Sequence, residues 1–244
     1  GLFITHFDAD HCQGVALLLE NLHVDYIFST YLPEDEEILD AINLSDAQSI
    51  ILQEKDQLKL DDATILDIIW PRGISNLDAN NRSLVSILKT NGANILLTGD
   101  IEREAEYLIK DRITEPIDII KVPHHGSNTS STDEFLYNIV PKEAIIQVGR
   151  NNLYNHPSDD VLNRYRSMGT TIYRTDEMGL VKVVLDEDHY EIISYLKDEM
   201  QQKHDFLNFL NDNTLDLVGY VLFFVIIYIM VKISSYRGDD FYDL

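Results

Sequence analysis

The chain has 244 residues, and its hydrophobic fraction of 45% and charged fraction of 25% exclude an intrinsically disordered protein. This length suits one domain with an appendage, and the single cysteine, Cys12, excludes an internal disulfide framework. The formal net charge of −23 excludes a generally basic surface of the kind that binds nucleic acid over a wide area.

Strand and helix patterns alternate along the first 195 residues. In chain order they predict a strand over 2–5, a helix over 13–22, a strand over 25–28, a helix over 33–42, strands over 49–53, 57–60, 63–69, 83–89 and 94–98, a helix over 102–110, a strand over 117–122, a helix over 132–139, a strand over 144–148, a helix over 158–168, and strands over 171–173, 180–185 and 190–193. Such alternation predicts a layered α/β domain over residues 1–195, with helices covering the faces of sheets.

The C-terminal part differs in composition. We expect a connecting helix or linker over residues 196–214, a hydrophobic transmembrane helix over 215–233 and a short acidic tail over 234–244. Residues 217–233 would span about 25 Å as a helix, the short end of the transmembrane range. The alternative is a buried core or partner helix. The prediction is a cytoplasmic domain anchored to the membrane by this C-terminal helix.

Four potential metal ligands lie within six residues, directly after the apolar run of the first strand. They are His6, Asp8, Asp10 and His11. Imidazole nitrogens suit zinc and other transition metals, whereas carboxylates also suit manganese. The segment therefore predicts ligands for one or two metal ions, with a polar turn after a strand as the alternative.

Three further polar clusters follow apolar strands. The first ends in Asp100, where the preceding glycine allows a close turn, and the second contains the adjacent pair His124 and His125. The third offers Arg150, Asn152 and His156. A carboxylate such as Asp100 has two oxygens and can bridge two ions.

Together these clusters resemble a known family. The segments H-F-D-A-D-H, L-L-T-G-D, V-P-H-H-G-S-N-T-S, V-G-R-N-N-L-Y-N-H-P and Y-R-T-D are similar to motifs of the metallo-β-lactamase superfamily, and most similar to the hydrolase domain of ComEC-type bacterial competence proteins. The resemblance covers roughly residues 1–185. It implies a four-layer αββα sandwich, here expected to lack its N-terminal strands and to carry the C-terminal hydrophobic helix in addition.

The resemblance also implies a dinuclear site with two divalent ions, zinc or manganese. The implied metal ligands are His6, Asp8, Asp10, His11, Asp100 and either His124 or His125; we assign His124 to the metal and His125 to catalysis. Asp10 would also orient or deprotonate the attacking water. The chain departs from the family at Asp8, where a histidine is usual, and it lacks the usual histidine between the first motif and Asp100.

Polar side chains near the third cluster could hold a phosphate group. We predict that Ser127, Arg150, Asn152 and His156 bind substrate. The alternatives are structural: Arg150 could pair with a surface carboxylate, and Ser127 could cap the helix that begins near Thr132.

The preferred function is a metal-dependent phosphodiesterase or nuclease that acts on DNA through a metal-activated water. Between Ile113 and Arg174 acidic and basic residues nearly balance, so a polyanionic substrate could be held locally. The second hypothesis is a hydrolase of a small phosphodiester or ester. The third is a catalytically inactive, membrane-anchored binding or regulatory module. The sequence does not indicate whether the protein is a monomer or an oligomer.

Overall fold

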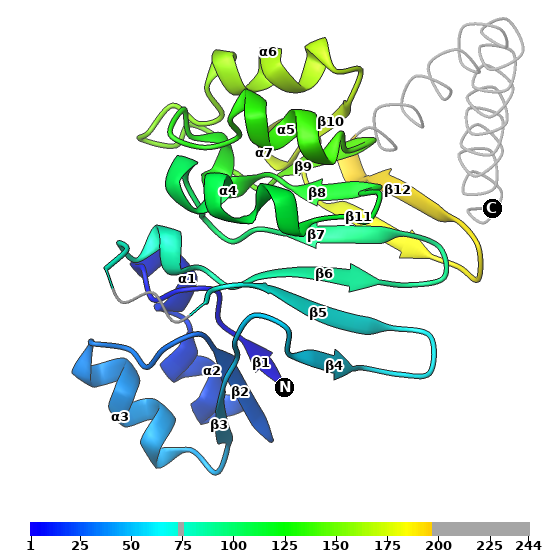
Figure 1. The fold of residues 1–244 in the computed structure, drawn as a ribbon. Coiled ribbons are helices and arrows are strands. Elements are labelled where there is room, and N and C mark those ends of the chain that lie inside the picture. Colours follow the sequence, from blue (N-terminus) through cyan, green and yellow to red (C-terminus); the bar gives the residue numbers. More distant parts are fainter. Residues whose placement is uncertain (73–75, 197–244) are drawn as a thin grey trace, which may run out of the picture. The chain divides into compact units, whose positions relative to one another are not determined.

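The computed structural model describes residues 1–72 and 76–196, and its compact unit is Gly1–Tyr195 (Figure 1). The helices are α1 (Ala9–Cys12), α2 (Val15–Asn21), α3 (Glu36–Leu44), α4 (Arg103–Ile109), α5 (Asp133–Ile139), α6 (Asp159–Ser167) and α7 (Thr175–Met178). The strands are β1 (Leu2–Phe3), β2 (Tyr26–Ser29), β3 (Gln48–Ile51), β4 (Gln57–Lys59), β5 (Ile65–Trp70), β6 (Val85–Lys89), β7 (Asn94–Leu97), β8 (Ile119–Lys121), β9 (Glu143–Ile146), β10 (Thr171–Arg174), β11 (Val181–Leu185) and β12 (Tyr190–Ser194). Short 3₁₀ turns lie at η1 (Asn80–Arg82), η2 (Lys110–Arg112) and η3 (Pro123–Gly126).

Every predicted strand and helix of the domain has a counterpart in this order, and α1 and α7 are additional. The helices begin where side chains cap the free N–H groups of the first turn. Asp35 accepts from two backbone N–H groups at the start of α3. Thr132 caps α5 and Ser158 caps α6 in the same way. Since Thr132 itself caps α5, Ser127 does not.

The central element is a seven-stranded sheet in the order β10-β9-β8-β7-β6-β5-β4. Strands β7 to β10 are parallel to one another, whereas β4, β5, β6 and β7 are joined by antiparallel pairings. A separate parallel sheet has the order β1-β2-β3, and β11 and β12 form an antiparallel pair.

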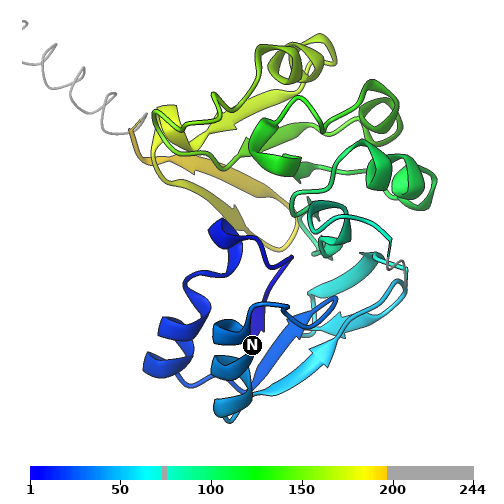
Figure 2. The same cartoon turned by 90° about the vertical axis from the view of Figure 1, so that its left-hand side faces the viewer.

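Four apolar clusters hold these pieces in layers. The largest packs α4, α5 and α6 on one face of the seven-stranded sheet (Figures 1 and 2). On the other face, β2 and β3 pack against β5, and β11 and β12 pack against β7 and β8. Helices α2 and α3 cover the far face of the small sheet. The order is helix, sheet, sheet, helix, with the second β layer made of two separate pieces.

This topology brings the predicted clusters to one edge. Strands β7, β8 and β9 run in the same direction, so the segments that follow them leave the sheet at their shared carboxyl edge. Asp100 follows β7, the His124–His125 pair follows β8, and the loop containing His156 follows β9. Ser83 precedes β6, which runs the opposite way, and therefore lies at the same edge.

The predicted linker, transmembrane helix and acidic tail lie outside the described residues, apart from the first residue of the linker. Within residues 1–72 and 76–196, no helix has both the length and the apolarity that crossing a bilayer requires.

Candidate metal centre

Asp100 is placed by a tight turn at the end of β7. Gly99 adopts a φ of +55°, and a Cβ atom there would lie 2.6 Å from the Cβ of Ser83. The backbone N–H of Asp100 donates to Ser83 Oγ at 3.1 Å. A residue with no side chain is needed at this close approach, because it allows both the left-handed backbone and the contact. As a result the carboxyl of Asp100 is held in a buried position at the edge of the sheet.

His11 and Asp10 reach the same point from the single turn of α1. His11 Nε2 lies 3.2 Å from Asp100 Oδ2 and 3.7 Å from Asp10 Oδ2. The other ring nitrogen of His11, Nδ1, lies 3.2 Å from Thr5 Oγ1. This contact fixes the ring orientation, as outer hydrogen-bond partners do for histidines that bind metals.

His125 approaches from the opposite side, from the turn η3 after β8. Its Nδ1 lies 2.6 Å from the carbonyl O of Gln147. A carbonyl only accepts, so Nδ1 carries a proton and the lone pair of neutral His125 is on Nε2. Nε2 lies 3.2 Å from Asp100 Oδ2, 3.4 Å from Asp10 Oδ2 and 3.3 Å from His11 Nε2.

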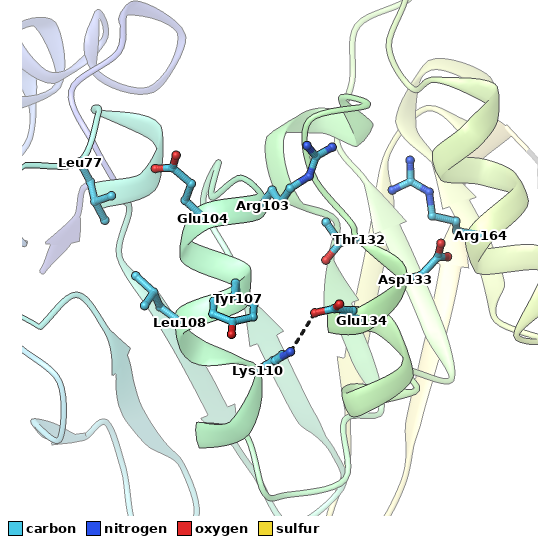
Figure 3. A pocket seen from close by; sticks show the side chains of 10 residues that line it. All are labelled: Leu77, Arg103, Glu104, Tyr107, Leu108, Lys110, Thr132, Asp133, Glu134 and Arg164. Atoms are coloured by element: carbon cyan, nitrogen blue, oxygen red, sulfur yellow. Dashed lines mark hydrogen bonds and ion pairs between the residues drawn. The ribbon is translucent and has the colours of Figure 1, made fainter.

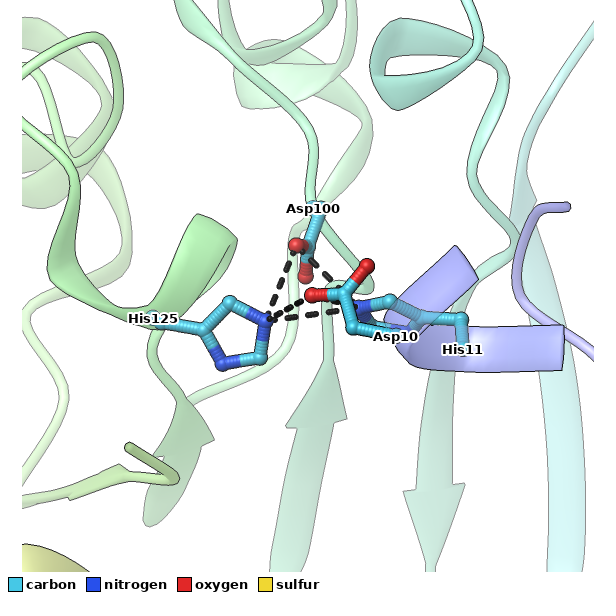
Figure 4. A group of neighbouring side chains, drawn as sticks. All are labelled: Asp10, His11, Asp100 and His125. Atoms are coloured by element: carbon cyan, nitrogen blue, oxygen red, sulfur yellow. Dashed lines mark hydrogen bonds and ion pairs between the residues drawn. The ribbon is translucent and has the colours of Figure 1, made fainter. Parts of the chain in front are cut away.

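The four ligand atoms of Asp10, His11, Asp100 and His125 all lie within 4.8 Å of one another (Figure 4). The group contains two carboxylates and two imidazoles that face a common point, and each histidine has its other ring nitrogen held by a partner. Such a donor set is suited to a divalent transition metal. The residues present therefore fit a metal ion. Among the residues that the structure describes, this is the group whose atoms converge in this way.

The backbone of η3 is strained where it carries the two histidines. His124 has φ 47° and ψ 45°, and His125 has φ 51° and ψ 20°. Each is in the left-handed region, which costs a residue other than glycine about 1–2 kcal/mol. Next to them Gly126 has φ +83°, and a Cβ there would lie 2.5 Å from the Cβ of Pro157. Strain of this kind persists when the surrounding structure imposes it and is concentrated at functional sites.

His6 and Asp8 lie beside the four-residue group but do not join it. His6 is 1% exposed, and its Nδ1 lies 3.2 Å from Ser83 Oγ. Its Nε2 is buried with no hydrogen-bond partner and lies 3.9 Å from Asp8 Oδ2. An unpartnered buried nitrogen is costly unless something binds its lone pair. Burial, followed by the charge of His11, lowers the pKa of His6 to about 4, so the ring is neutral at pH 7.

The centre also fixes the charge of Asp100. Burial opposes ionisation of this carboxyl, but hydrogen bonds from His11 and His125 and the charge of Lys121 hold its pKa well below the usual range. The hydrogen bond to Asp100 raises the pKa of His125 against the effect of burial. The two shifts agree: in the absence of metal the Asp100 carboxylate and the protonated ring of His125 stabilise each other.

His124 lies outside the group of four, against the prediction that it rather than His125 would be the ligand. Its Nδ1 lies 3.0 Å from Glu102 Oε1 and 3.3 Å from Thr129 Oγ1. Thr129 in turn donates to Glu102 at 2.9 Å. The geometry therefore favours the reverse of the predicted assignment, with His125 among the ligand atoms and His124 held by a carboxylate.

The centre opens into a pocket of about 450 Å³. Asp10, His125, Asn152 and His156 all contribute to its lining. Asn152, however, uses its amide to hold the loop: Nδ2 donates to the carbonyl O of His156 at 2.7 Å, and Oδ1 accepts from the N–H of His156 at 2.9 Å. Of the four predicted substrate residues, Asn152 and His156 therefore lie at the pocket.

The other two predicted substrate residues point elsewhere. Ser127 is buried, and its Oγ lies 3.0 Å from Thr129 Oγ1. Arg150 is exposed and its Nε donates to the carbonyl O of Asp176 at 3.1 Å, so it pairs with a backbone oxygen instead of the side-chain carboxylate considered as its alternative.

A larger pocket, of about 870 Å³, lies away from these residues, over α4 and α5 (Figure 3). Arg103, Tyr107 and Arg164 are in its lining, and an ion pair joins Lys110 and Glu134 with 2.9 Å between Nζ and Oε2. None of its lining residues belongs to the group of four. The larger pocket therefore contains no residue of the candidate metal centre, whereas the smaller pocket is lined by two of them, Asp10 and His125.

Comparison with known proteins identifies the family. The model of the metallo-beta-lactamase superfamily matches residues 1–150. The chain belongs to this superfamily. Its fold and its His/Asp centre are accordingly those of a metallo-β-lactamase-fold, metal-dependent hydrolase.

Curated relatives confirm the predicted resemblance to ComEC-type proteins. The chain is 32% identical to ComE operon protein 3 of Bacillus subtilis over 186 residues, which cover 74% of this chain and 24% of that protein. It is 32% identical to Competence protein ComA of Neisseria gonorrhoeae over 123 residues, which cover 50% of this chain and 18% of that protein. It is also 32% identical to Recombination protein 2 of Haemophilus influenzae over 125 residues, 51% of this chain and 16% of that protein. The chain thus spans about a quarter or less of the length of these relatives.

A solved structure is similar over most of the domain. The metallo-beta-lactamase fold protein YhfI from Bacillus subtilis aligns with a TM-score of 0.44 and 10% identity, over 70% of this chain and 72% of that one.

Two charged residues of the centre, Glu102 and Lys121, are absent from the predicted site. Glu102 was included only in a helix pattern, although it stands two positions after Asp100. Lys121 was included only in a strand, although a lysine that interrupts the apolar run Ile119–Val122 is a signal of its own. Its Nζ donates to Asp100 Oδ1 at 3.1 Å.

Proposed function

We propose that the chain is a metal-dependent phosphodiesterase that acts on nucleic acid. The observation that carries this proposal is the convergence of Asp10, His11, Asp100 and His125 at a pocket that Asp10 and His125 also line. A divalent ion held by these residues would supply Lewis-acid stabilisation of a phosphoryl oxygen and a more acidic water. The names of two relatives, a competence protein and a recombination protein, support DNA as the substrate.

The side chains around the centre can share the proton transfers of hydrolysis. Asp10 has a side chain that is 66% exposed towards solvent, so a water in the pocket can give it a proton. His124 has its Nδ1 held by Glu102 at 3.0 Å, so a protonated His124 ring would donate its second proton, on Nε2, to the leaving oxygen. A base or acid oriented by a third group is the arrangement expected of a catalytic histidine. The proposed general acid is therefore His124 instead of His125, and Asp10 keeps its predicted role towards the attacking water.

A second candidate is hydrolysis of a small phosphodiester. The pocket volume of about 450 Å³ falls in the range of small-molecule sites, and the net charge of −23 disfavours long contacts with a polyanion. In this case the same residues act, but binding is confined to the pocket.

The deciding experiment uses the full chain, stripped of metal and reloaded with Mn²⁺ or Zn²⁺. Linear single- and double-stranded DNA and bis-p-nitrophenyl phosphate are supplied in parallel, with Asp100→Asn as the matched control. Metal-dependent cleavage of DNA by the wild type alone supports the nuclease. Cleavage of the small ester alone supports the second candidate. If neither is cleaved while the metal is bound, the chain is a binding module and the proposed function is wrong.

We also propose that residues 215–233 anchor the domain to a membrane on its cytoplasmic side. The support is the apolar composition of that segment. Expression of the full chain and of a version ending at residue 196, followed by membrane fractionation and carbonate extraction, tests this. Recovery of the full chain in the aqueous fraction would contradict it.

A further inference from the structure

Lys121 is a charged residue in a strand whose neighbours are buried and apolar. It ends β8, after Ile119 and Ile120, both of which have no exposed surface. Its side chain is 18% exposed, and Nζ donates to the carbonyl O of Gly99 at 2.9 Å and to Asp100 Oδ1 at 3.1 Å. A lysine in such a position needs partners for its ammonium group. Here both partners belong to the turn that delivers Asp100 to the metal centre.

The two oxygens of Asp100 have different environments. Oδ2 faces His11 Nε2 and His125 Nε2, each at 3.2 Å, and so belongs to the four-residue group. Oδ1 faces Lys121 Nζ. A carboxylate that bridges two ions through its two oxygens needs both of them, but one is already taken by an ammonium group.

The structure contains some of the remaining ligands that a second ion would need, but not a full set. His6 Nε2 is buried and unpartnered, and Asp8 Oδ2 is 3.9 Å away from it. These atoms offer one nitrogen and one carboxylate oxygen. Asp100 Oδ1 is the natural third ligand, and an ion bound to it would lie next to the positive charge of Lys121, which repels it.

We propose that Lys121 takes the place of the second ion, so that the centre binds one divalent metal tightly and Lys121 supplies the second positive charge. This inference rests on the metal dependence in the proposed function, but not on its substrate. It replaces the expected dinuclear site with one metal held by Asp10, His11, Asp100 Oδ2 and His125, next to a fixed ammonium group. The ion and the ammonium group carry three positive charges against the two carboxylates of Asp10 and Asp100, which leaves one positive charge among these four groups for a phosphodiester.

The test counts bound ions without any substrate. The full chain is stripped with a chelator and titrated with Mn²⁺, with calorimetry for stoichiometry and electron paramagnetic resonance for the spin coupling of neighbouring ions. For the wild type we expect one tight equivalent and the spectrum of an isolated ion. For Lys121→Met, which keeps the length of the side chain but removes its charge, we expect a second equivalent that binds at least about tenfold more tightly than in the wild type, and a coupled spectrum.

Two control variants separate charge from structure. Lys121→Arg keeps the positive charge and is expected to bind one equivalent. Lys142→Met removes a surface lysine that pairs with Asp118, with 2.6 Å between Nζ and Oδ1, and is also expected to bind one. Two tight, coupled ions in the wild type overturn the inference, even if Lys121→Met fails to fold. A folded Lys121→Met that still binds one ion overturns it as well. Failure to cleave any phosphodiester would contradict the proposed function, but it would not affect the measured number of bound ions.

Discussion

His124 and His125 are adjacent in sequence, but their rings contact different carboxylates. His125 Nε2 lies 3.2 Å from Asp100 Oδ2, whereas His124 Nδ1 lies 3.0 Å from Glu102 Oε1. Both residues have a positive φ, so the chain turns sharply between the two side chains. The two neighbouring side chains therefore have different positions, His125 within the ligand group and His124 beside it.

Replacement of each histidine by alanine should therefore have different effects. His125→Ala removes a ligand, so we expect Mn²⁺ affinity to fall by at least about 100-fold, beyond the 10–100-fold typical of lost outer-shell partners. His124→Ala should keep the affinity within a few-fold but lower kcat for a phosphodiester by about 10²–10⁴-fold, the range for loss of a general acid. Calorimetry and steady-state kinetics measure the two effects. Loss of metal in His124→Ala with retention in His125→Ala would restore the original assignment.

Gly99→Ala should damage the fold at the metal centre. The new methyl group would lie 2.6 Å from Ser83 Cβ, and the φ of +55° is unfavourable for alanine. We expect a loss of at least about 2 kcal/mol in the free energy of unfolding of the metal-free protein. Urea denaturation measures it.

Gly14→Ala is the matched control for this substitution. Gly14 has φ −81°, and no heavy atom lies within 4 Å of its Cβ position. We expect this variant to be neutral or more stable by up to about 1 kcal/mol, because alanine reduces the entropy of the unfolded chain. Equal destabilisation by both variants would show that the close approach at Gly99 is not needed.

His6 should make the metal-free protein less stable as the solution becomes acidic. Its pKa of about 4 in the folded state lies below the usual 6.5, so the unfolded state binds more protons between these values. The stabilisation is present above pH 6.5 and is lost as the pH falls towards 4, by up to about 3 kcal/mol. Unfolding of the chelated protein across this pH range tests the sign and size.

The variant His6→Asn isolates this contribution. It should flatten the dependence of stability on pH between 6.5 and 4, whatever its own stability at neutral pH. His23→Asn is the control, because that side chain is 79% exposed and pairs only with Asp25 among the contacts of the structure. An unchanged slope in His6→Asn would mean that another group titrates.

The order of elements could be predicted from the sequence because the apolar periodicity of each segment is strong. The motifs that follow β7, β8 and β9 could also be predicted to meet, since these parallel neighbouring strands end at one edge of the same sheet. Three residues of the predicted motifs, Asp10, His11 and Asp100, have their ligand atoms close together in the structure, whereas His6 lies beside them. These predictions needed only the spacing of residue types along single segments.

What could not be predicted depends on contacts between segments. The different directions of the His124 and His125 rings depend on two left-handed backbone angles, which no local pattern indicates. Asn152 has the polarity of a substrate ligand, but its amide is used by the loop around His156. Lys121 lies within a predicted strand, and only the fold brings its Nζ to Asp100 Oδ1. Each case concerns the direction of a side chain, which tertiary packing decides.

Asn81→Ala tests whether the segment before β6 supports the start of α4 and, through Glu102, the metal centre. Asn81 is 1% exposed, and its Oδ1 accepts from the backbone N–H groups of Glu102 at 2.9 Å and Ala105 at 3.2 Å. Removal of this acceptor leaves the buried N–H of Ala105 and the half-buried N–H of Glu102 without this partner. A buried donor left without its partner costs about 1–3 kcal/mol and a half-buried one costs less, so we expect the free energy of unfolding to fall by about 2–4 kcal/mol.

The neighbouring asparagine provides the control for this variant. Asn80 is half-buried, and its Nδ2 reaches Glu102 Oε1 only at 3.5 Å, so Asn80→Ala should change stability by no more than about 0.5 kcal/mol. Glu102 also holds His124, so Asn81→Ala should lower kcat at a temperature where the variant is still folded, with Mn²⁺ affinity kept. Full activity in a folded but destabilised Asn81→Ala would show that α4 holds Glu102 in place without the side chain of Asn81.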